Sequence, residues 1–204
     1  MPTEVDIANM ALSRLGTRAS IADLSESSTE ARVVRTWYAA TRDALLRAHA
    51  WNFARVRRAL SLSGSAPAGW RFSYALPSDC LRFLGIDAAI RSTSPASIPP
   101  SIQWELASDG TSRFVLCDEA GAIGLYTQRV TDTARMDAAF VAAFVDRLAA
   151  HIAYPVTQKT EIAVRLAEIA RRSLDEAAAA SANEDNARRG DWADWDAEYV
   201  RVRG

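Results

Sequence analysis

Residues 137–155 read DAAFVAAFVDRLAAHIAYP, and this stretch decides the fold. Its apolar residues recur every three or four positions: Phe140, Val141, Phe144, Val145, Leu148 and Ile152. That spacing is typical of a helix with one continuous apolar face. Proline lacks the N–H that a helix interior needs, so we expect the helix to begin at Asp137 and to end at Pro155. The rest of the chain must cover its apolar face.

A short helix is predicted near the N-terminus. Residues 4–15 place four apolar side chains on one face, with Thr3 as the N-cap and Gly16 just past the end. The apolar positions are Val5, Ala8, Leu12 and Leu15.

A longer helix is predicted to follow. Residues 27–30 read SSTE, in which Ser27 and Glu30 can form a capping box. The expected apolar stripe beyond it consists of Val34, Trp37, Tyr38, Thr41, Leu45 and Ala48. The charged residues expected off this stripe are Arg32, Arg35, Arg42, Asp43 and Arg47. Two adjacent aromatic residues on such a stripe, here Trp37 and Tyr38, more often belong to the core than to a ligand site.

The middle third of the chain changes to the alternating pattern of strands. RVRRALSL at 55–62 and WRFSYAL at 70–76 flank the turn region SGSAPAG, which predicts a hairpin-like structure. Further short strands are expected at 81–86, 103–107, 113–117 and 124–130. Together they predict a small antiparallel sheet, with an exposed, mobile loop at 92–101.

Helical periodicity returns near Thr157 and runs through Ile162, Leu166, Ile169 and Leu174 into an Ala-rich stretch. The closing segment is too charged to form core, yet it contains Trp192, Trp195 and Tyr199. Spaced aromatic residues in a polar tail favour a role in partner binding, because each ring buries a large area at small entropy cost. The alternative is a tail folded back on its own helix.

These patterns predict an α+β fold, mainly a helical bundle with a small antiparallel β-rich insertion and an extended C-terminal tail. The helical domain is expected to comprise residues 1–60 and 131–186. The insertion is expected at 61–130 and the docking tail at 187–204.

Composition excludes several classes of protein. With 49% hydrophobic residues, 24% charged residues and a net charge of −1, the chain matches an ordinary globular protein. It carries no strong electrostatic signal for nucleic acid or membrane, and we expect neither an export signal nor a membrane span. Of its 24 basic residues all but Lys159 are Arg. This bias indicates either selection for bidentate pairing of Arg guanidinium groups at interfaces or a GC-rich coding genome.

No pattern points to catalysis. Glycine-rich phosphate loops are absent from the sequence, and two cysteines with two histidines give neither a disulfide framework nor zinc-ligand spacing. A nucleophile built from Cys80, His49 and Asp79 has no support in their spacing, and Cys80 is expected to be a core residue. We therefore expect no catalytic residue, no cofactor and no metal site.

Charged helix surfaces are the remaining candidates. Arg and Glu residues follow the last helix at Arg165, Glu168, Arg171, Arg172 and Glu176. Such faces are usually solvated, but they can equally lie between neighbouring subunits, where forked Arg groups pair with carboxylates.

Four blocks of the sequence, in this order, carry a resemblance to a known family. They are DIANMALSRLG at 6–16, the run 21–54, YALPSDCLRFLGI at 74–86 and the run 129–157. Within the second block, Thr36–Ala54 is the most distinctive part, and LPSDCLR at 76–82 is an independent match. Over roughly residues 4–175 the chain is similar to the tail tubular protein A family, the head-to-tail adaptors of tailed bacteriophages.

This resemblance implies a structural virion protein of the tail or neck, present in the host cytoplasm during assembly. It implies a ring of identical subunits, a dodecamer, joining the portal protein to the tail nozzle (tubular) protein. Double-stranded DNA would pass through the bore without specific binding. No catalytic residues are carried over from the family, and the C-terminal tail matches none of its patterns.

Two other functions stay open at the level of sequence. A virion-associated cell-wall hydrolase is the first alternative, because carboxylates alone suffice for glycoside hydrolysis. The second is a nucleic-acid binder that acts through Arg55, Arg57 and Arg58, with Arg55 and Arg57 on one face of a strand.

Overall fold

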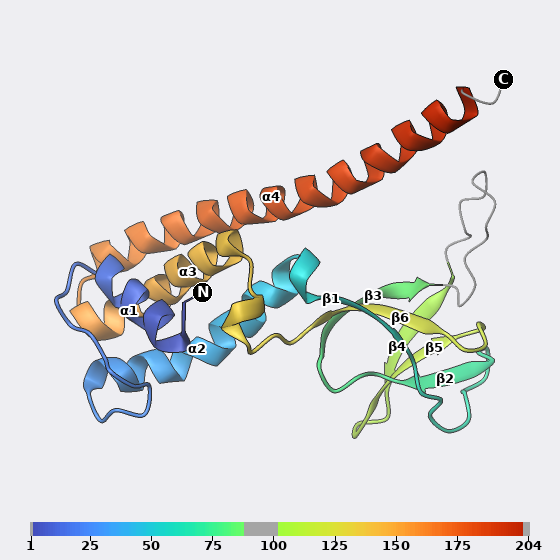
Figure 1. The fold of residues 1–204 in the computed structure, drawn as a ribbon. Coiled ribbons are helices and arrows are strands. Elements are labelled where there is room, and N and C mark those ends of the chain that lie inside the picture. The colour runs from blue at the N-terminus through green and yellow to red at the C-terminus, as the bar shows by residue number, and fades with distance from the viewer. Residues whose placement is uncertain (1, 88–101, 202–204) are drawn as a thin grey trace. The chain divides into compact units, whose positions relative to one another are not determined.

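The computed structural model describes residues 2–87 and 102–201, and for residues 185–201 it describes the backbone alone. The chain forms two compact units, Met1–Phe53 with Val130–Gly204 and Ala54–Arg129 (Figure 1). The first is helical and the second is built of strands, so the fold is mixed α+β. The expected loop at 92–101 lies outside the described residues.

Helix α3, Ala138–Thr157, is the centre of the helical unit and bears out the predicted apolar face. Phe140, Phe144, Leu148 and Ile152 are fully buried. Asp137 caps the helix by accepting hydrogen bonds from the N–H groups of Ala139 and Phe140. The predicted end at Pro155 is wrong, because a proline so near the C-terminus removes only one backbone hydrogen bond. The helix closes instead at Gln158, whose backbone is left-handed (φ 58°).

Helix α1, Glu4–Arg14, packs on α3 through Ile7, Ala8, Ala11 and Leu12. The predicted Thr3 cap is confirmed and forms a reciprocal box with Asp6. Gly16 follows the helix at φ +73°, a conformation that favours glycine.

Helix α2, Thr29–Ala48, also packs on α3 and differs in four details from the prediction. Ala48, expected on the apolar stripe, is exposed. Its cap is Ser28 rather than Ser27, since Ser28 accepts from the N–H of Ala31. Trp37 is 39% exposed, whereas Arg42, expected at the surface, is 7% exposed. Arg42 is tolerated inside because its guanidinium pairs with Asp43 at 2.9 Å.

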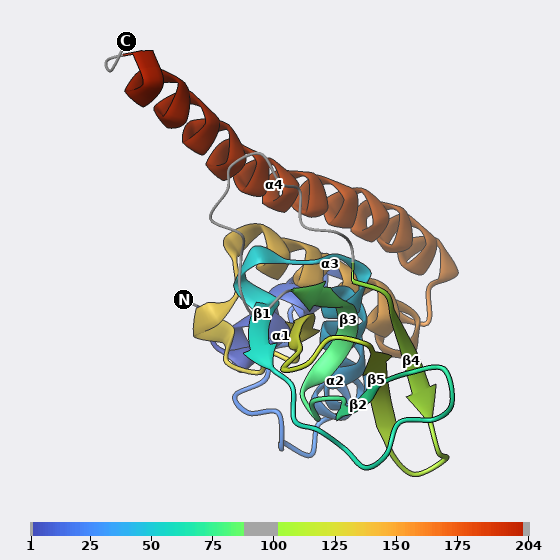
Figure 2. The same ribbon diagram turned by 90° about the vertical axis from the view of Figure 1, so that its right-hand side faces the viewer.

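Helix α4, Thr160–Arg201, runs along α3 (Figure 2). Its buried stripe is narrow and made of Leu166, Ala170 and Ala177, while Ile169, expected inside, is 40% exposed. The backbone is helical through Arg201, which includes most of the segment for which an extended tail is predicted. That segment contains no proline, and its Ala, Glu and Arg residues are good helix formers.

The β unit contains two antiparallel three-stranded sheets in place of the single sheet predicted. One has the order β1-β6-β3, formed by Arg55–Ala59, Ile123–Gln128 and Cys80–Asp87. The other has the order β2-β5-β4, formed by Phe72–Ala75, Arg113–Cys117 and Trp104–Ser108. The expected first hairpin therefore contributes its strands to different sheets, although Leu62 still bridges to Tyr74. The first unit boundary falls after Phe53 because β1 pairs with β6.

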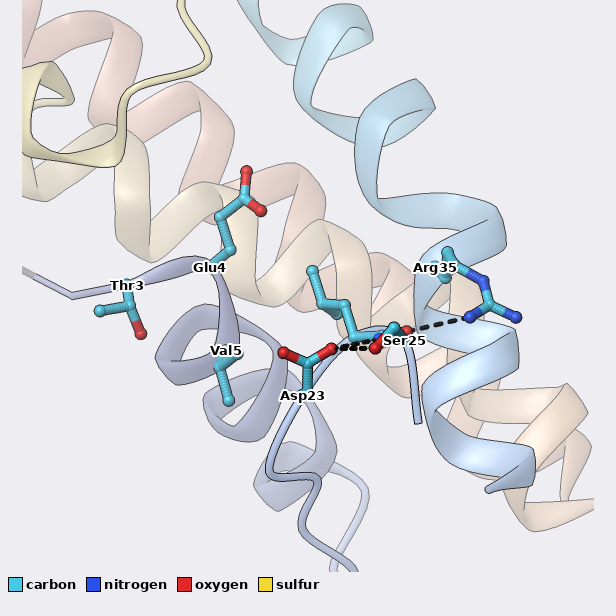
Figure 3. A pocket seen from close by; sticks show the side chains of 7 residues that line it. Thr3, Glu4, Val5, Asp23, Ser25 and Arg35 are labelled. Atoms are coloured by element: carbon cyan, nitrogen blue, oxygen red, sulfur yellow. Dashed lines mark hydrogen bonds between the residues drawn. The ribbon is translucent and has the colours of Figure 1, made fainter. Parts of the chain in front are cut away.

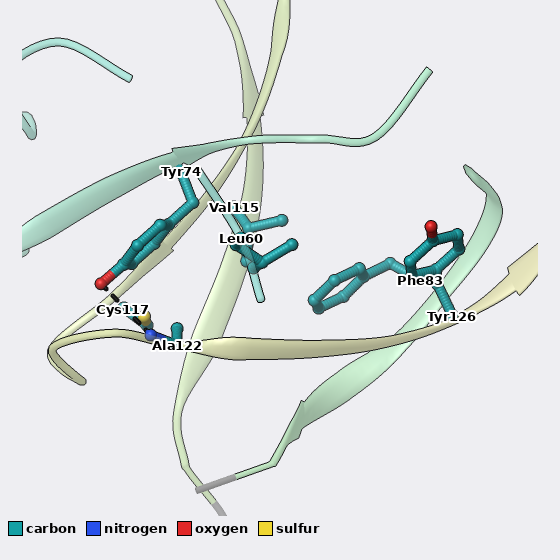
Figure 4. Packing of buried hydrophobic residues seen from close by; sticks show 7 residues of the cluster. All are labelled: Leu60, Tyr74, Phe83, Val115, Cys117, Ala122 and Tyr126. Carbon is teal, nitrogen blue, oxygen red and sulfur yellow. Dashed lines mark hydrogen bonds between the residues drawn. The ribbon is translucent and has the colours of Figure 1, made fainter. Parts of the chain in front are cut away.

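The core of the β unit lies among residues of both sheets (Figure 4). Its buried members are Leu60, Tyr74, Phe83, Val115, Cys117, Ala122 and Tyr126. At Gly124 a Cβ atom would lie 2.8 Å from Leu60 Cδ2 and 3.0 Å from the Phe83 ring. This close approach disfavours any larger residue at Gly124, the second residue of β6.

Within the described residues, one helix, α3, is long and apolar enough to cross a membrane. Of the 18-residue stretch of α3 that is apolar enough for this, 56% is buried inside the protein. Its apolar residues are thus accounted for by packing in the helical unit, and length and composition alone are weak grounds for a membrane span.

Candidate interaction surfaces

The most distinctive sequence run, Thr36–Ala54, is a packing element. Trp51 is 1% exposed and donates its indole N–H to the carbonyl of Leu45 at 2.8 Å. Its ring meets Phe140 edge-on at 5.1 Å, and Phe53 contacts the same ring at 5.1 Å. His49, the C-cap residue of α2, lies against Trp51 at 5.1 Å. These aromatic residues pack the end of α2 against the start of α3.

Asn52 fastens α4 to this junction. Its side-chain amide donates to the carbonyl of Ser181 at 2.9 Å and lies 3.5 Å from a carboxylate oxygen of Glu184. The carboxylate of Glu184 therefore also lies at this junction.

Asp79, in the second distinctive run, organises the first sheet of the β unit. Its carboxylate accepts hydrogen bonds from Tyr126 at 3.1 Å and Gln128 at 2.8 Å, both on β6. It also pairs with Arg58 on β1 at 3.5 Å. One side chain thus joins the start of β3 to its neighbour β6 and, beyond it, to β1. Burial, followed by the nearby Asp79 carboxylate, raises the pKa of Tyr126 to about 12.

The residues considered for nucleophilic chemistry have these structural roles instead. Asp79 holds strands together, and His49 caps α2 in the other unit. Cys80 is half-buried rather than core, whereas Cys117 is buried and its pKa is raised by that burial. Among the described residues, no group of His, Cys, Asp and Glu has the arrangement of a metal site.

A polar pocket of about 470 Å³ opens beside the start of α1 (Figure 3). Thr3, Glu4, Asp23, Ser25 and Arg35 are among its lining residues. Asp23 accepts hydrogen bonds from the backbone N–H and the hydroxyl of Ser25, and both lower its pKa. The Arg35 guanidinium donates to the carbonyl of Leu24 at 3.2 Å. These local bonds stabilise the loop before α2, and they keep Asp23 ionised.

An exposed aromatic patch, formed by Trp37, His151 and Tyr154, lies where α2 meets α3. Trp37 is 39% exposed and lies 4.9 Å from the His151 ring. His151 is tied inward through Nδ1 to the buried hydroxyl of Thr41 at 2.9 Å. Tyr154, three residues further along α3, is 53% exposed. Burial, followed by the charge of Arg147, lowers the pKa of His151.

An apolar groove of about 310 Å³ lies between α1 and α3. We call it the α1–α3 groove; its lining residues are Met10, Ser13, Arg14, Ala138, Val141, Ala142 and Val145. Met10 is 44% exposed on one wall. Arg14 reaches across and pairs through Nε with the buried carboxylate of Asp146 at 3.1 Å. About half of the Arg14 side chain stays exposed beside the groove.

The sequence did not identify either the aromatic patch or the groove. Trp37 is interpreted there as core, and Tyr154 lies in the last turn of a helix whose apolar face points elsewhere. Two adjacent helices form each surface, so periodicity along one helix does not reveal it.

The predicted charged face of α4 is exposed at Arg165, Glu168, Arg171, Arg172 and Glu176. Within it, Arg171 pairs with Asp175 at 3.8 Å along the helix. On strand β1, Arg57 and Arg58 are exposed and Arg55 is partly buried. Because Arg58 is paired with Asp79, it also has a structural role.

The predicted docking residues Trp192, Trp195 and Tyr199 lie in the part of α4 whose side chains are outside the described residues. Their role remains a prediction. No protein-family model and no curated protein matches the sequence.

Proposed function

We propose that this protein is a structural head-to-tail adaptor of a tailed-phage virion, assembled as a ring between the portal and the tail nozzle. The observation that carries the proposal is that both distinctive runs of the sequence serve as scaffold. Trp51 and Asn52 join three helices, and Asp79 joins three strands. A protein whose most characteristic residues build rigid junctions suits a load-bearing connector better than an enzyme.

The exposed surfaces suit self-association in a ring. Subunits of a closed ring make heterologous contacts, so each copy needs two different faces for its neighbours. The helical unit presents both an aromatic patch and an apolar groove, in addition to the charged face of α4. A net charge of −1 also suits a bore through which DNA slides, since a strongly basic bore would retain the DNA.

The hydrolase alternative receives less support from the described carboxylates. Glycoside hydrolysis needs one carboxylic acid that stays protonated near neutral pH, hence a raised pKa. Asp23, in the polar pocket, has its pKa lowered, as do Asp6 and Asp109. A peptidoglycan turbidity assay separates the two functions, and the adaptor predicts no clearing.

Cryo-electron microscopy of the protein mixed with its portal tests the proposal. The adaptor predicts a ring of density, one copy per binding position, added to one end of the portal. Portal particles without added density, at saturating protein, would contradict it. As a control, a variant that disrupts the helical core, such as Phe144→Ala, should add no density.

A further inference from the structure

The aromatic patch and the α1–α3 groove lie on opposite sides of one helix. An α-helix has 3.6 residues per turn, so positions nine apart differ by about two and a half turns and point in opposite directions. Val145 in the groove and Tyr154 in the patch are nine apart, and so are Ala142 and His151. The core helix α3 therefore carries a projecting aromatic surface on one side and an apolar hollow on the other.

The charges around the two surfaces are complementary. Arg147 lies one turn before His151 and acts on its pKa, so the patch has a basic flank. Beside the groove, Asp137 caps α3 next to Ala138, and Asp6 lies one turn before Met10 on α1. Both carboxylates are exposed. The groove thus has an acidic flank, opposite in sign to the patch, while the charge of Arg14, which also lines the groove, is paired with Asp146.

We propose that the aromatic patch of one copy packs into the α1–α3 groove of a second copy, with Tyr154 as the inserted side chain. The tyrosine ring then contacts Met10 and Ala142 and lies beside the exposed part of Arg14, an arrangement that favours a cation–π contact. Arg147 of the first copy faces Asp137 of the second. This inference rests on the proposed function, for which it names the surfaces that join ring neighbours.

The dimensions of the groove agree with this occupant. Its volume of about 310 Å³ is about twice the roughly 150 Å³ of an engineered cavity that takes up benzene, so it has room for the phenol ring of one tyrosine. A contact built around one ring, one charge pair and one cation–π contact is smaller than the ~1,200–2,000 Å² of a standard stable interface. Because the contact is this small, we expect the chain to associate weakly on its own and to need a template to form a ring.

The two surfaces are different and lie on opposite sides of α3, so the same contact can be repeated from one copy to the next. A patch that fills a groove leaves the second copy's own patch open for a third copy. Repetition of such a head-to-tail contact gives a closed ring if the rotation per copy divides a full turn. A contact between identical surfaces would stop at a dimer.

Photo-crosslinking maps the contact directly. The full chain carrying benzoylphenylalanine in place of Tyr154 is mixed with isotopically labelled unmodified chain and irradiated, and the adducts are sequenced by mass spectrometry. We expect mixed-label adducts at residues 10–14 or 138–145. Intermolecular adducts at other positions, or none at the highest concentration reached, would overturn the inference.

Variants test the same contact without the probe. Ala142→Trp fills the groove, and we expect it to lower the adduct yield about tenfold or more, the effect of losing one strong hot spot. Ala167→Trp, an equally large change at an exposed position of α4, should leave the yield unchanged. Melting temperatures of both variants show whether each is folded. If folded Ala142→Trp crosslinks as well as the control, the groove is not the binding surface.

Mixing complementary variants then tests the direction of the contact. Tyr154→Ala keeps a working groove, and Ala142→Trp keeps a working patch. Because a single contact is weak without the portal, crosslinking is the measurement: Ala142→Trp carrying benzoylphenylalanine at position 154, irradiated with Tyr154→Ala, should give adducts of two chains. The probe-bearing Ala142→Trp chain alone should give none, and a mixture without adducts contradicts the head-to-tail contact. If both variants still form rings on the portal, the inference fails while the adaptor function stands. If the mapped contact is found but no ring forms on the portal, the adaptor function fails instead.

Discussion

The side-chain amide of Asn52 donates a hydrogen bond of 2.9 Å to the carbonyl of Ser181, 129 residues further along the chain. This bond joins the short segment after α2 to the middle of α4. It lies beside Trp51, whose indole is buried against Phe140 of α3. Three helices are therefore fixed relative to one another by two adjacent residues.

Replacing Asn52 with alanine should destabilise the protein by about 1–2 kcal/mol, because it leaves the carbonyl of Ser181 without this donor. Urea unfolding followed by circular dichroism measures the change. Asn183→Ala, an exposed change on the same helix, should alter stability by less than about 0.5 kcal/mol. Equal effects of the two substitutions would show that the bond does not fasten α4.

Phe144→Ala should cost about 3–5 kcal/mol, since the side chain is fully buried and packs against the ring of Tyr38 at 4.9 Å. Little folded protein should remain at physiological temperature. Val164→Ala, at a position 56% exposed on α4, is the matched control and should leave the melting temperature nearly unchanged. An unchanged melting temperature for Phe144→Ala would mean that the core face of α3 is assigned wrongly.

The β unit should lose stability at alkaline pH. The pKa of Tyr126 is raised from 10.0 to about 12, so the folded state holds the phenol proton more tightly than the unfolded state. This contribution is fully present below pH 10 and is lost as the pH rises from 10 to about 12, by roughly 2 kcal/mol. Tyr126→Phe should remove that loss, and spectrophotometric titration together with unfolding at each pH measures it. An identical pH dependence in Tyr126→Phe would rule out this linkage.

Much of the helical unit could be predicted from the sequence. The apolar period of α3 is strong, and the Thr3 and Asp137 positions each precede a helical pattern. Trp37 and Arg42 could not be assigned in this way. Both lie at the edge of the buried face of α2. The exposure of Trp37 depends on its contact with His151 of α3, and the burial of Arg42 depends on its pairing with Asp43.

The β unit was harder to predict for a different reason. Alternation identifies strands but does not give their partners, and β1 and β2 belong to separate sheets although a short turn region joins them. The aromatic patch and the groove each arise between two helices, so no single period marks them. The distinctive residues Asn52 and Asp79 act through hydrogen bonds over long separations in sequence, which spacing alone cannot show.

Deleting residues 187–204 should leave the fold and melting temperature nearly intact, because Ser181 and Glu184, the contacts of Asn52, are retained. It should weaken ring formation on the portal by several kcal/mol, the scale of two aromatic hot spots at about 2 kcal/mol each. Binding titrations of full-length and truncated chains on portal rings measure the difference. Equal affinity would show that Trp192 and Trp195 do not anchor a partner, and unfolding would favour a tail packed on its own helix.

Native mass spectrometry of the protein mixed with its portal tests the adaptor role most directly. The isolated chain should be mainly monomeric, because the proposed contact is small and gains too little free energy to overcome the entropy of association. With portal present, the spectrum should show a complex that carries one full ring of added subunits, with twelve expected from the family resemblance. A spectrum that contains only free portal and monomer, at concentrations that saturate binding, would contradict the account.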